Sequence, residues 1–278
     1  GHAHRLGRGL ERPDPGHLDA PAGPTAGTVV WSVAPVSGVR ALVMTLRMIP
    51  PTVSAPSTPP VFTGGGRHWT RQDTVRAVVA GVALVGSGAA AAHGLSPFER
   101  LVYDAVYAVP SAIYPVVWPV MQIGSLGGGL ALAAAMGVGT RRWSVGAFGL
   151  AAVGSSWVVA KAIKALVKRG RPTEFELVTA FDRGAPDGGL GFVSGHTTVA
   201  FALYAMAVPH LSRRYRVPAL VLASLVGLSR IYVGAHLPLD VVGGAALGTL
   251  TGEAFRWTET RWRSGRLPGV SAEDPVPT

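Results

Sequence analysis

The sequence lacks cysteine and has few charged residues. None of its 278 residues is Cys, which excludes disulfide frameworks, cysteine-ligated zinc, iron–sulfur clusters and thiol nucleophiles. Charged residues make up 14% of the chain, whereas a soluble globular domain carries about 25%. Hydrophobic residues reach 48%, the mean hydropathy is +0.34, and the apolar residues fall in long blocks rather than in amphipathic stripes. The shortage of charge therefore predicts a protein that is surrounded by lipid.

The first part of the chain differs from the rest. Over residues 1–66, Pro and Gly recur without a period, and neither helical nor strand alternation is sustained, so we expect a disordered leader. The apolar run Thr28–Met44 contains Pro35 and Arg40, which disfavour a membrane span there. The expected organisation is a leader over 1–66, a membrane domain over 67–263 and a short polar tail over 264–278.

The apolar blocks after residue 66 predict an all-α integral membrane protein with six transmembrane helices. A helix along the membrane surface is expected over Ser96–Pro110, because Phe98 and Leu101 lie on its apolar stripe and Glu99 lies off it. The six spans are expected over these segments: Ala77–Ala92, Ala112–Gly139, Trp143–Leu166, Ser194–Leu211, Val217–Val233 and Leu237–Phe255.

Glycines repeat at every fourth position of the sixth expected span. Gly244, Gly248 and Gly252 form one small-residue face. In lipid, such a face lets two helix backbones approach closely. We therefore expect this face to pack against another helix.

The Lys and Arg residues between the spans predict the orientation. The chain has 25 basic and 15 acidic residues, a net charge of +10. By the positive-inside rule, the side with most basic residues is cytoplasmic. Twelve arginines mark that side: Arg67, Arg71, Arg76, Arg141, Arg142, Arg213, Arg214, Arg216, Arg256, Arg261, Arg263 and Arg266. We therefore expect a multi-pass protein of the inner or plasma membrane with both termini in the cytoplasm.

Basic residues gather at the end of the third expected span. Lys161, Lys164 and Lys168 are spaced three and four apart, which places them on one helical face, and Arg171 follows just before Pro172 ends the helix. Such a face is suited to an anion. Alternatively, these cations stabilise the helix C-terminus and reach toward lipid headgroups.

The fourth expected span begins with Ser194, Gly195 and His196. Ser194 is a favourable N-cap, and the free backbone N–H groups of the first turn form an anion site beside a histidine that can donate a proton. The alternative is an ordinary capped helix with a histidine near the interface.

The junction of the fifth and sixth spans carries Ser229, Arg230, His236 and Asp240. His236 and Asp240 are four residues apart, and Pro238 is tolerated in a first helical turn, so Asp240 is expected to accept a hydrogen bond from His236 and fix its tautomer. A histidine oriented in this way has its other nitrogen free as a nucleophile or base. The alternative is a buried ion pair that joins two spans.

The expected topology brings these three groups to one membrane face. The end of the third span, the start of the fourth and the junction of the fifth and sixth all lie on the extracytoplasmic side. Three cations, two histidines and one carboxylate then meet there. This set is suited to a phosphate, because fixed positive charge binds the oxygens, one histidine attacks and the other protonates the leaving oxygen.

The residues resemble the type 2 phosphatidic acid phosphatase superfamily. Its signature has three parts, K-x6-R-P, P-S-G-H and S-R-x5-H-x3-D, which occur here in the same order and at the same span ends. One departure is Val193, which replaces the first Pro of the second part. The matching residues are Lys164, Arg171 and Pro172, then Ser194, Gly195 and His196, then Ser229, Arg230, His236 and Asp240.

The resemblance implies phosphoester hydrolysis through a phosphohistidine, without a metal or other cofactor. His236 is then the nucleophile, Asp240 orients it, and His196 protonates the leaving group. The substrate implied is a lipid phosphate or pyrophosphate from the outer leaflet: a polyprenyl pyrophosphate, phosphatidate or phosphatidylglycerol phosphate. The implied phosphate ligands are Lys164, Arg171, Ser194, Gly195 and Arg230.

Other functions fit the sequence less well. A non-catalytic lipid-phosphate binder or transporter needs the cations but not the set of His196, His236 and Asp240. Nucleic-acid binding would need a continuous basic surface, whereas the basic residues here are divided among loops. The soluble haloperoxidases of the same superfamily lack six lipid-spanning segments. No protein partner is indicated.

Overall fold

The structure is a computed structural model, and it describes residues 61–62, 69–178 and 182–265. The expected disordered leader, apart from Val61 and Phe62, and nearly all of the expected tail lie outside the described residues. Within these residues the fold is helical, and no strand is formed beyond an isolated bridge between Phe62 and Leu211. The helices are α1 (Arg71–Ala92), α2 (Pro97–Tyr107), α3 (Tyr114–Ile123), α4 (Leu126–Thr140), α5 (Trp143–Val167), α6 (Gly195–Ala207), α7 (Arg213–Tyr232) and α8 (Pro238–Arg263).

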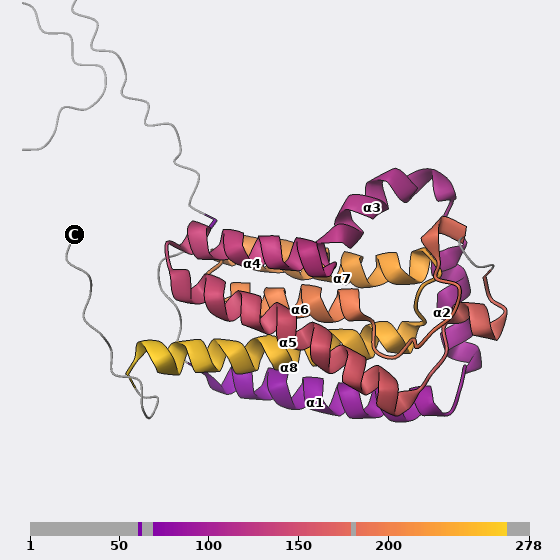
Figure 1. The fold of residues 1–278 in the computed structure, drawn as a ribbon, viewed down its shortest axis with the longest axis horizontal. Coiled ribbons are helices and arrows are strands. Elements are labelled where there is room, and N and C mark those ends of the chain that lie inside the picture. Colours follow the sequence, from indigo (N-terminus) through magenta and orange to yellow (C-terminus); the bar gives the residue numbers. More distant parts are fainter. Residues whose placement is uncertain (1–60, 63–68, 179–181, 266–278) are drawn as a thin grey trace, which may run out of the picture. The chain divides into compact units, whose positions relative to one another are not determined.

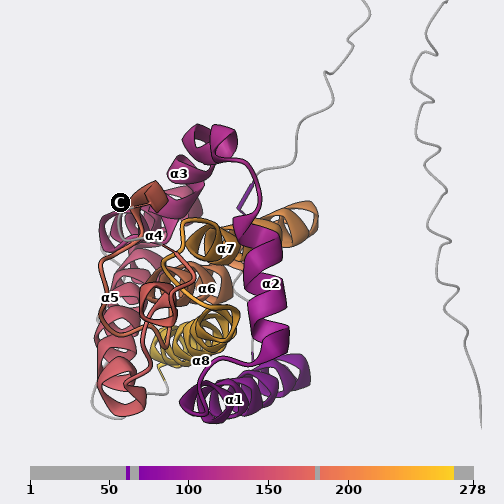
Figure 2. The same ribbon diagram turned by 90° about the vertical axis from the view of Figure 1, so that its right-hand side faces the viewer.

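The long helices run side by side, and α2 lies across one end of them. Figure 1 shows α1, α4, α5, α6, α7 and α8 extending in the same general direction. Figure 2 looks onto the end where α2 crosses and where the loops that follow α5 and α7 gather. Three short 3-10 helices in the described residues, Ser111–Ile113, Pro172–Phe175 and Asp182–Gly184, lie in the connections.

The glycine face of α8 packs against α6, as the sequence predicts. A Cβ atom added to Gly244 would lie 2.6 Å from the carbonyl oxygen of Ser194. A Cβ atom on Gly248 would overlap the carbonyl oxygen of Thr198, and one on Gly252 would lie 2.5 Å from that of Ala202. Because only hydrogen fits at these positions, the two backbones touch, and the start of α6 is fixed beside the start of α8.

The expected span Ala112–Gly139 is broken in the structure. Helix α3 ends at Ile123 and α4 begins at Leu126, where Ser125 caps the new helix by accepting a 3.0 Å hydrogen bond from the Gly128 N–H. A Cβ atom on Gly124 would lie 2.6 Å from the carbonyl oxygen of His196. The break therefore lets the chain pass directly over the first turn of α6.

Two described helical segments are long and apolar enough to cross a membrane, Arg71–Ala92 and Trp143–Phe175. A third candidate is the pair Pro97–Tyr107 and Ser111–Ile123, if the two segments count as one span. These two segments are bent by 67° relative to each other. The total of six spans stays a prediction.

Helix α2 packs against the rest of the protein through the side that carries Glu99 and Tyr103. Phe98 and Leu101, from the apolar stripe, are 75% and 65% exposed. Glu99 and Tyr103 are buried instead, and the Glu99 carboxylate pairs with Arg169. Glu99 thus lies off the apolar stripe, as the sequence pattern predicts, and an arginine from a distant part of the chain supplies its counter-charge in the interior.

A buried ionic cluster joins α1 and α8 at the other end of the helices. Arg256 donates a 2.7 Å hydrogen bond from Nε to Glu253 and lies 3.1 Å from Asp73. Arg76 approaches the same two carboxylates at 3.2 and 3.4 Å. Arg256 lies sixteen residues after Asp240 on α8, about 24 Å along a helix that rises about 1.5 Å per residue.

Candidate active site

The ends of α5 and α7 meet the starts of α6 and α8, as expected from the sequence. The backbone N–H of Ser194 donates a 2.9 Å hydrogen bond to the carbonyl oxygen of Asp240. Arg171 donates from Nη1 to the carbonyl oxygen of Ala235 at 3.0 Å. A pocket of about 460 Å³ opens at this junction. Six of the eight expected site residues line it: Lys164, Arg171, Gly195, His196, Arg230 and His236.

His236 and Asp240 form the pair that their spacing predicts. Helix α8 begins at Pro238, where a missing N–H costs nothing, so Asp240 lies in the first turn. Its Oδ2 atom is 3.3 Å from Nδ1 of His236 and accepts a 3.0 Å hydrogen bond from the Leu237 N–H. When Nδ1 carries the proton and donates a hydrogen bond to Asp240, Nε2 keeps its lone pair, which is then free for a group bound in the pocket.

His236 lies between α7 and α8 and is only 3% exposed. Burial, followed by the positive charges of Lys164, Arg171 and Arg230, lowers its pKa well below the usual range of a histidine. The cause is that the charged imidazolium loses hydration and meets like charge. The ring is therefore neutral at physiological pH, the state that a nucleophile or base requires.

Four cationic side chains line the pocket, those of Lys161, Lys164, Arg171 and Arg230. Lys164 donates from Nζ to the carbonyl oxygens of Leu190 and Gly191 at 2.9 and 2.7 Å, which fixes the ammonium group at the pocket wall. The Nε atoms of Arg171 and Arg230 are buried and have no hydrogen-bond partner among the described residues. Both side chains line the pocket, so an anion bound there would lie beside two guanidinium groups.

At the start of α6, some residues line the pocket and others are buried in the core. Gly195 and His196 line the pocket. Ser194 occupies the N-cap position but is fully buried, and its hydroxyl accepts a 2.9 Å hydrogen bond from the Thr197 hydroxyl instead of capping the backbone. Val193, the departure from the family signature, is fully buried in an apolar cluster with Ala160 and Leu247. The substitution therefore contributes to packing behind the pocket.

The pocket also contains residues that the motifs did not indicate. Trp157 and Leu190 line it, and Nζ of Lys161 lies 3.6 Å from the centroid of the Trp157 ring. Lys168 leaves the expected lysine face, because it ends α5 in the left-handed conformation with φ of 53°. For Lys161, the spacing to Lys164 on one helical face was a signal in the sequence. Arg169, which contacts Asp240, had no comparable signal.

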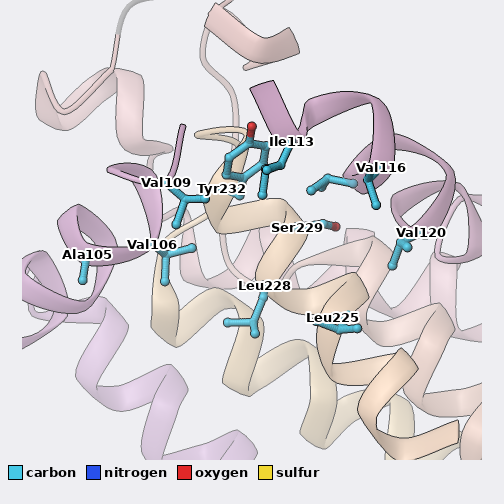
Figure 3. Close-up of a pocket in the computed structure, with 11 residues that line it drawn as sticks. Ala105, Val106, Val109, Ile113, Val116, Val120, Leu225, Leu228, Ser229 and Tyr232 are labelled. Carbon is cyan, nitrogen blue, oxygen red and sulfur yellow. The ribbon is translucent and has the colours of Figure 1, made fainter. Parts of the chain in front are cut away.

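An apolar groove of about 460 Å³ lies between α2, α3 and α7. Figure 3 shows side chains from these helices around it, including Val106, Val116 and Leu228. Ser229 lines this groove, whereas the next residue, Arg230, lines the polar pocket. The turn of α7 that carries these two residues therefore separates an apolar surface from a cationic one.

Known proteins share the segment that carries the three motifs. Residues 144–263 match the family model described as PAP2 superfamily. The lipid A 1-phosphatase of Rhizobium etli is 36% identical over 107 residues, which are 37% of this chain and 46% of that protein. The undecaprenyl-diphosphatase BcrC of Bacillus subtilis is 38% identical over 64 residues, which are 23% of this chain and 33% of that protein. The matched segments thus span less than half of each curated relative.

A solved structure shares the fold. The transmembrane PAP2-type phosphatidylglycerolphosphate phosphatase from Bacillus subtilis superposes with a TM-score of 0.55 at 23% identity. The alignment covers 67% of this chain and 96% of that one. At this identity the likeness concerns the helical architecture. Residues 144–263, the part of the chain that matches the PAP2 superfamily model, contain all three motifs.

Proposed function

We propose that this protein is an integral membrane phosphatase that hydrolyses a lipid phosphate or diphosphate through a phosphohistidine intermediate. The observation that carries the proposal is the contact of 3.3 Å between Nδ1 of His236 and Asp240 beside a pocket lined by four cations. A site that only bound anions would need the cations but not a neutral, carboxylate-oriented histidine.

The proposed reaction has two steps. Nε2 of His236 attacks the terminal phosphorus, and an N–P bond forms. The bond from that phosphorus to the leaving oxygen breaks, which is the ester oxygen of a lipid phosphate or the bridging oxygen of a lipid diphosphate, and His196 donates a proton to that oxygen. A water molecule then attacks phosphorus while His196 accepts its proton, the N–P bond breaks, and inorganic phosphate leaves. The Lys164, Arg171 and Arg230 side chains and the Gly195 N–H stabilise the charge on the phosphoryl oxygens. No metal takes part.

The proposed substrate is a phosphorylated lipid. The names of the three relatives refer to lipid A, undecaprenyl diphosphate and phosphatidylglycerolphosphate. The groove beside α7 offers an apolar surface to a hydrocarbon chain, next to the pocket that would hold the phosphate. We favour a polyprenyl diphosphate, with phosphatidate and phosphatidylglycerol phosphate as the other members of the class.

The proposed setting is a bacterial inner membrane. Six spans place both termini in the cytoplasm and the pocket on the extracytoplasmic side, as the arginine distribution predicts. The substrate then enters sideways from the outer leaflet. We propose that residues 67–263 form the phosphatase domain and that residues 1–66 and 264–278 lie outside it.

The test is phosphate release by the purified full chain in detergent with EDTA present. A polyprenyl diphosphate, phosphatidate and phosphatidylglycerol phosphate are compared, with His236→Ala as the inactive variant. Lys161→Gln is the matched control, because Lys161 shares the pocket but takes no part in the proposed reaction. We expect release that does not need metal, that disappears in His236→Ala and that persists in Lys161→Gln.

The ranking of the three lipids then assigns the substrate. Activity that returns only when a divalent metal is added would contradict the histidine mechanism. Hydrolysis of none of the three lipids by folded protein that binds vanadate would favour the alternative of a lipid-phosphate binder or transporter.

A further inference from the structure

Asp240 has a second partner, Arg169, on the side away from His236. Arg169 donates from Nη1 to Oδ1 of Asp240 at 3.1 Å, whereas Oδ2 of Asp240 serves His236 and the Leu237 N–H. The two carboxylate oxygens thus have separate tasks. Because a carboxylate is planar, holding Oδ1 sets the direction in which Oδ2 points.

Arg169 is itself held by Glu99. Its Nη1 donates to Oε1 of Glu99 at 2.9 Å and its Nη2 donates to Oε2, so the guanidinium and the carboxylate form a two-pronged pair. Nη2 also donates to the carbonyl oxygen of Gly94 at 3.0 Å. A continuous line of contacts therefore runs from Glu99 through Arg169 and Asp240 to His236.

The course of the backbone turns Arg169 away from the phosphate pocket. Lys168 ends α5 in the left-handed conformation. The carbonyl oxygen of Arg169 accepts a 2.6 Å hydrogen bond from the Gly191 N–H, in the loop whose carbonyl oxygens hold Lys164. Arg169 is not among the residues that line the pocket, unlike Arg171 two positions later. Its side chain reaches α2 and α8 instead.

The three charged side chains are almost completely buried. The exposed fractions are 2% for the side chains of Arg169 and Glu99 and 0% for that of Asp240. A buried carboxylate without a counter-charge is costly, and it protonates or moves to relieve that cost. The single guanidinium of Arg169 supplies the counter-charge for both Asp240 and Glu99.

Glu99 also fastens the first turn of α8. Its Oε1 atom accepts a 2.9 Å hydrogen bond from the Leu239 N–H, one residue before Asp240. The Ser96 side chain caps α2 just before Glu99 by accepting from the Glu99 N–H at 3.1 Å. Helix α2, whose exposed apolar residues face outward, thus holds the catalytic turn of α8 through one buried carboxylate.

We propose that Arg169, held by Glu99, is a positioning residue that fixes the carboxylate of Asp240 and thereby the ring of His236, without contacting the phosphate. The inference rests on the proposed function for its kinetic consequence. It separates Arg169 from Lys164, Arg171 and Arg230, which face the pocket. Loss of Arg169 then slows the chemical step and leaves phosphate binding unchanged.

The experiment compares Arg169→Gln, Arg169→Lys and Glu99→Gln with the unmodified full chain in detergent. Arg256→Gln is the matched control, because Arg256 is an equally buried arginine between two carboxylates, Asp73 and Glu253, at the far end of α8. The readouts are kcat and KM for the best lipid substrate, the inhibition constant of inorganic phosphate, and thermal stability.

We expect Arg169→Gln to lower kcat by about 10- to 100-fold. This range is the one found at metal sites when the group that orients a metal-binding histidine is removed. KM and the phosphate inhibition constant should change less than about twofold. Arg169→Lys keeps the positive charge but cannot form the bidentate pair with Glu99, so it should retain more activity than Arg169→Gln. Glu99→Gln should also lower kcat, whereas Arg256→Gln should lower only the thermal stability.

Two results would overturn the inference. A kcat for folded Arg169→Gln that equals that of Arg256→Gln would reduce Arg169 to a structural role. A rise in KM and in the phosphate inhibition constant at unchanged kcat would make Arg169 a phosphate ligand. If Arg169→Gln does not fold, Arg169→Lys and Glu99→Gln carry the same comparison.

A measurement without turnover separates this inference from the proposed function. In protein labelled with ¹⁵N-histidine, the ring shifts of His236, assigned through His236→Asn, report which nitrogen carries the proton. We expect the Nδ1–H form in the unmodified chain and in Arg256→Gln, and a mixture of tautomers in Arg169→Gln. A wild-type chain that hydrolyses no lipid would refute the proposed function alone, whereas an unchanged tautomer in Arg169→Gln would refute the inference alone.

Discussion

The backbone N–H of Ser194 donates a 2.9 Å hydrogen bond to the carbonyl oxygen of Asp240. This single bond joins the first turn of α6, which carries His196, to the first turn of α8, which carries the partner of His236. The backbone segments that carry the proposed acid and the partner of the proposed nucleophile are therefore joined by a main-chain hydrogen bond.

The first prediction concerns pH. Because the pKa of His236 is lowered, the neutral ring persists as pH falls, so the acid limb of kcat/KM that belongs to His236 should lie well below pH 6.5. Lys164→Gln removes the positive charge that, after burial, lowers the pKa of His236 most, so this pKa rises and the limb should move up toward pH 6.5. The pH profile of kcat/KM measures this shift. Lys161→Gln should leave the profile in place, and an equal shift in both variants would argue against a local charge effect.

The second prediction concerns phosphate binding. Arg171 presents a buried Nε–H without a partner among the described residues and lies on the pocket wall. Arg171→Gln should raise both KM and the inhibition constant of inorganic phosphate about tenfold or more, because a charge-assisted hydrogen bond contributes about 1.5–3 kcal/mol. Competitive inhibition assays measure this. Unchanged phosphate inhibition would exclude Arg171 as a ligand.

The third prediction concerns the contact between α6 and α8. A Cβ atom on Gly248 would overlap the carbonyl oxygen of Thr198, so Gly248→Ala should force the helices apart and cost about 1–3 kcal/mol of stability. Gly81→Ala on α1 is the control, because nothing lies within 4 Å of its added Cβ. Thermal unfolding in detergent should show a clear loss for the first variant. An equal effect of both substitutions would mean that helix propensity, and not the close contact, is being measured.

The fourth prediction concerns the apolar groove. Val116 lines the groove and is 72% exposed, whereas Val82 on α1 is 69% exposed and lies outside it. Val116→Trp should fill the groove and raise KM severalfold for a long-chain lipid phosphate, with little change for a short-chain, water-soluble analogue. Val82→Trp should change neither value. If Val116→Trp slows both substrates equally, the groove does not hold the hydrocarbon chain.

The fifth prediction concerns orientation. The chain has no cysteine, so a single introduced thiol is the only one present. Asp187→Cys lies in the exposed loop after α5, and Arg213→Cys lies at the exposed start of α7. In intact cells, an impermeant thiol reagent should label the first variant and not the second. The reverse pattern would invert the proposed topology.

Several contacts in the structure can be predicted from the spacing of residues along the sequence. The four-residue spacing of His236 and Asp240 predicts their contact, because a first helical turn that starts at a proline brings such side chains together. The glycine repeat of α8 predicts a close helix pair for an equally local reason, since residues four apart share a face. The apolar segments also predicted most of the helices, although one expected span is divided at Gly124 and Ser125.

The helical membrane class, the motif residues and the pairing of His236 with Asp240 can thus be predicted from local sequence patterns. The surroundings of that pair depend on the packing of distant parts of the chain. Arg169 and Glu99 are 70 residues apart, and neither belongs to a spaced motif, so no period or local rule links them. Both charges can be buried because one end each of α2, α5 and α8 meet at this place, so that the two side chains pair with each other. Burial makes each charge require the other, and burial is a property of the folded chain.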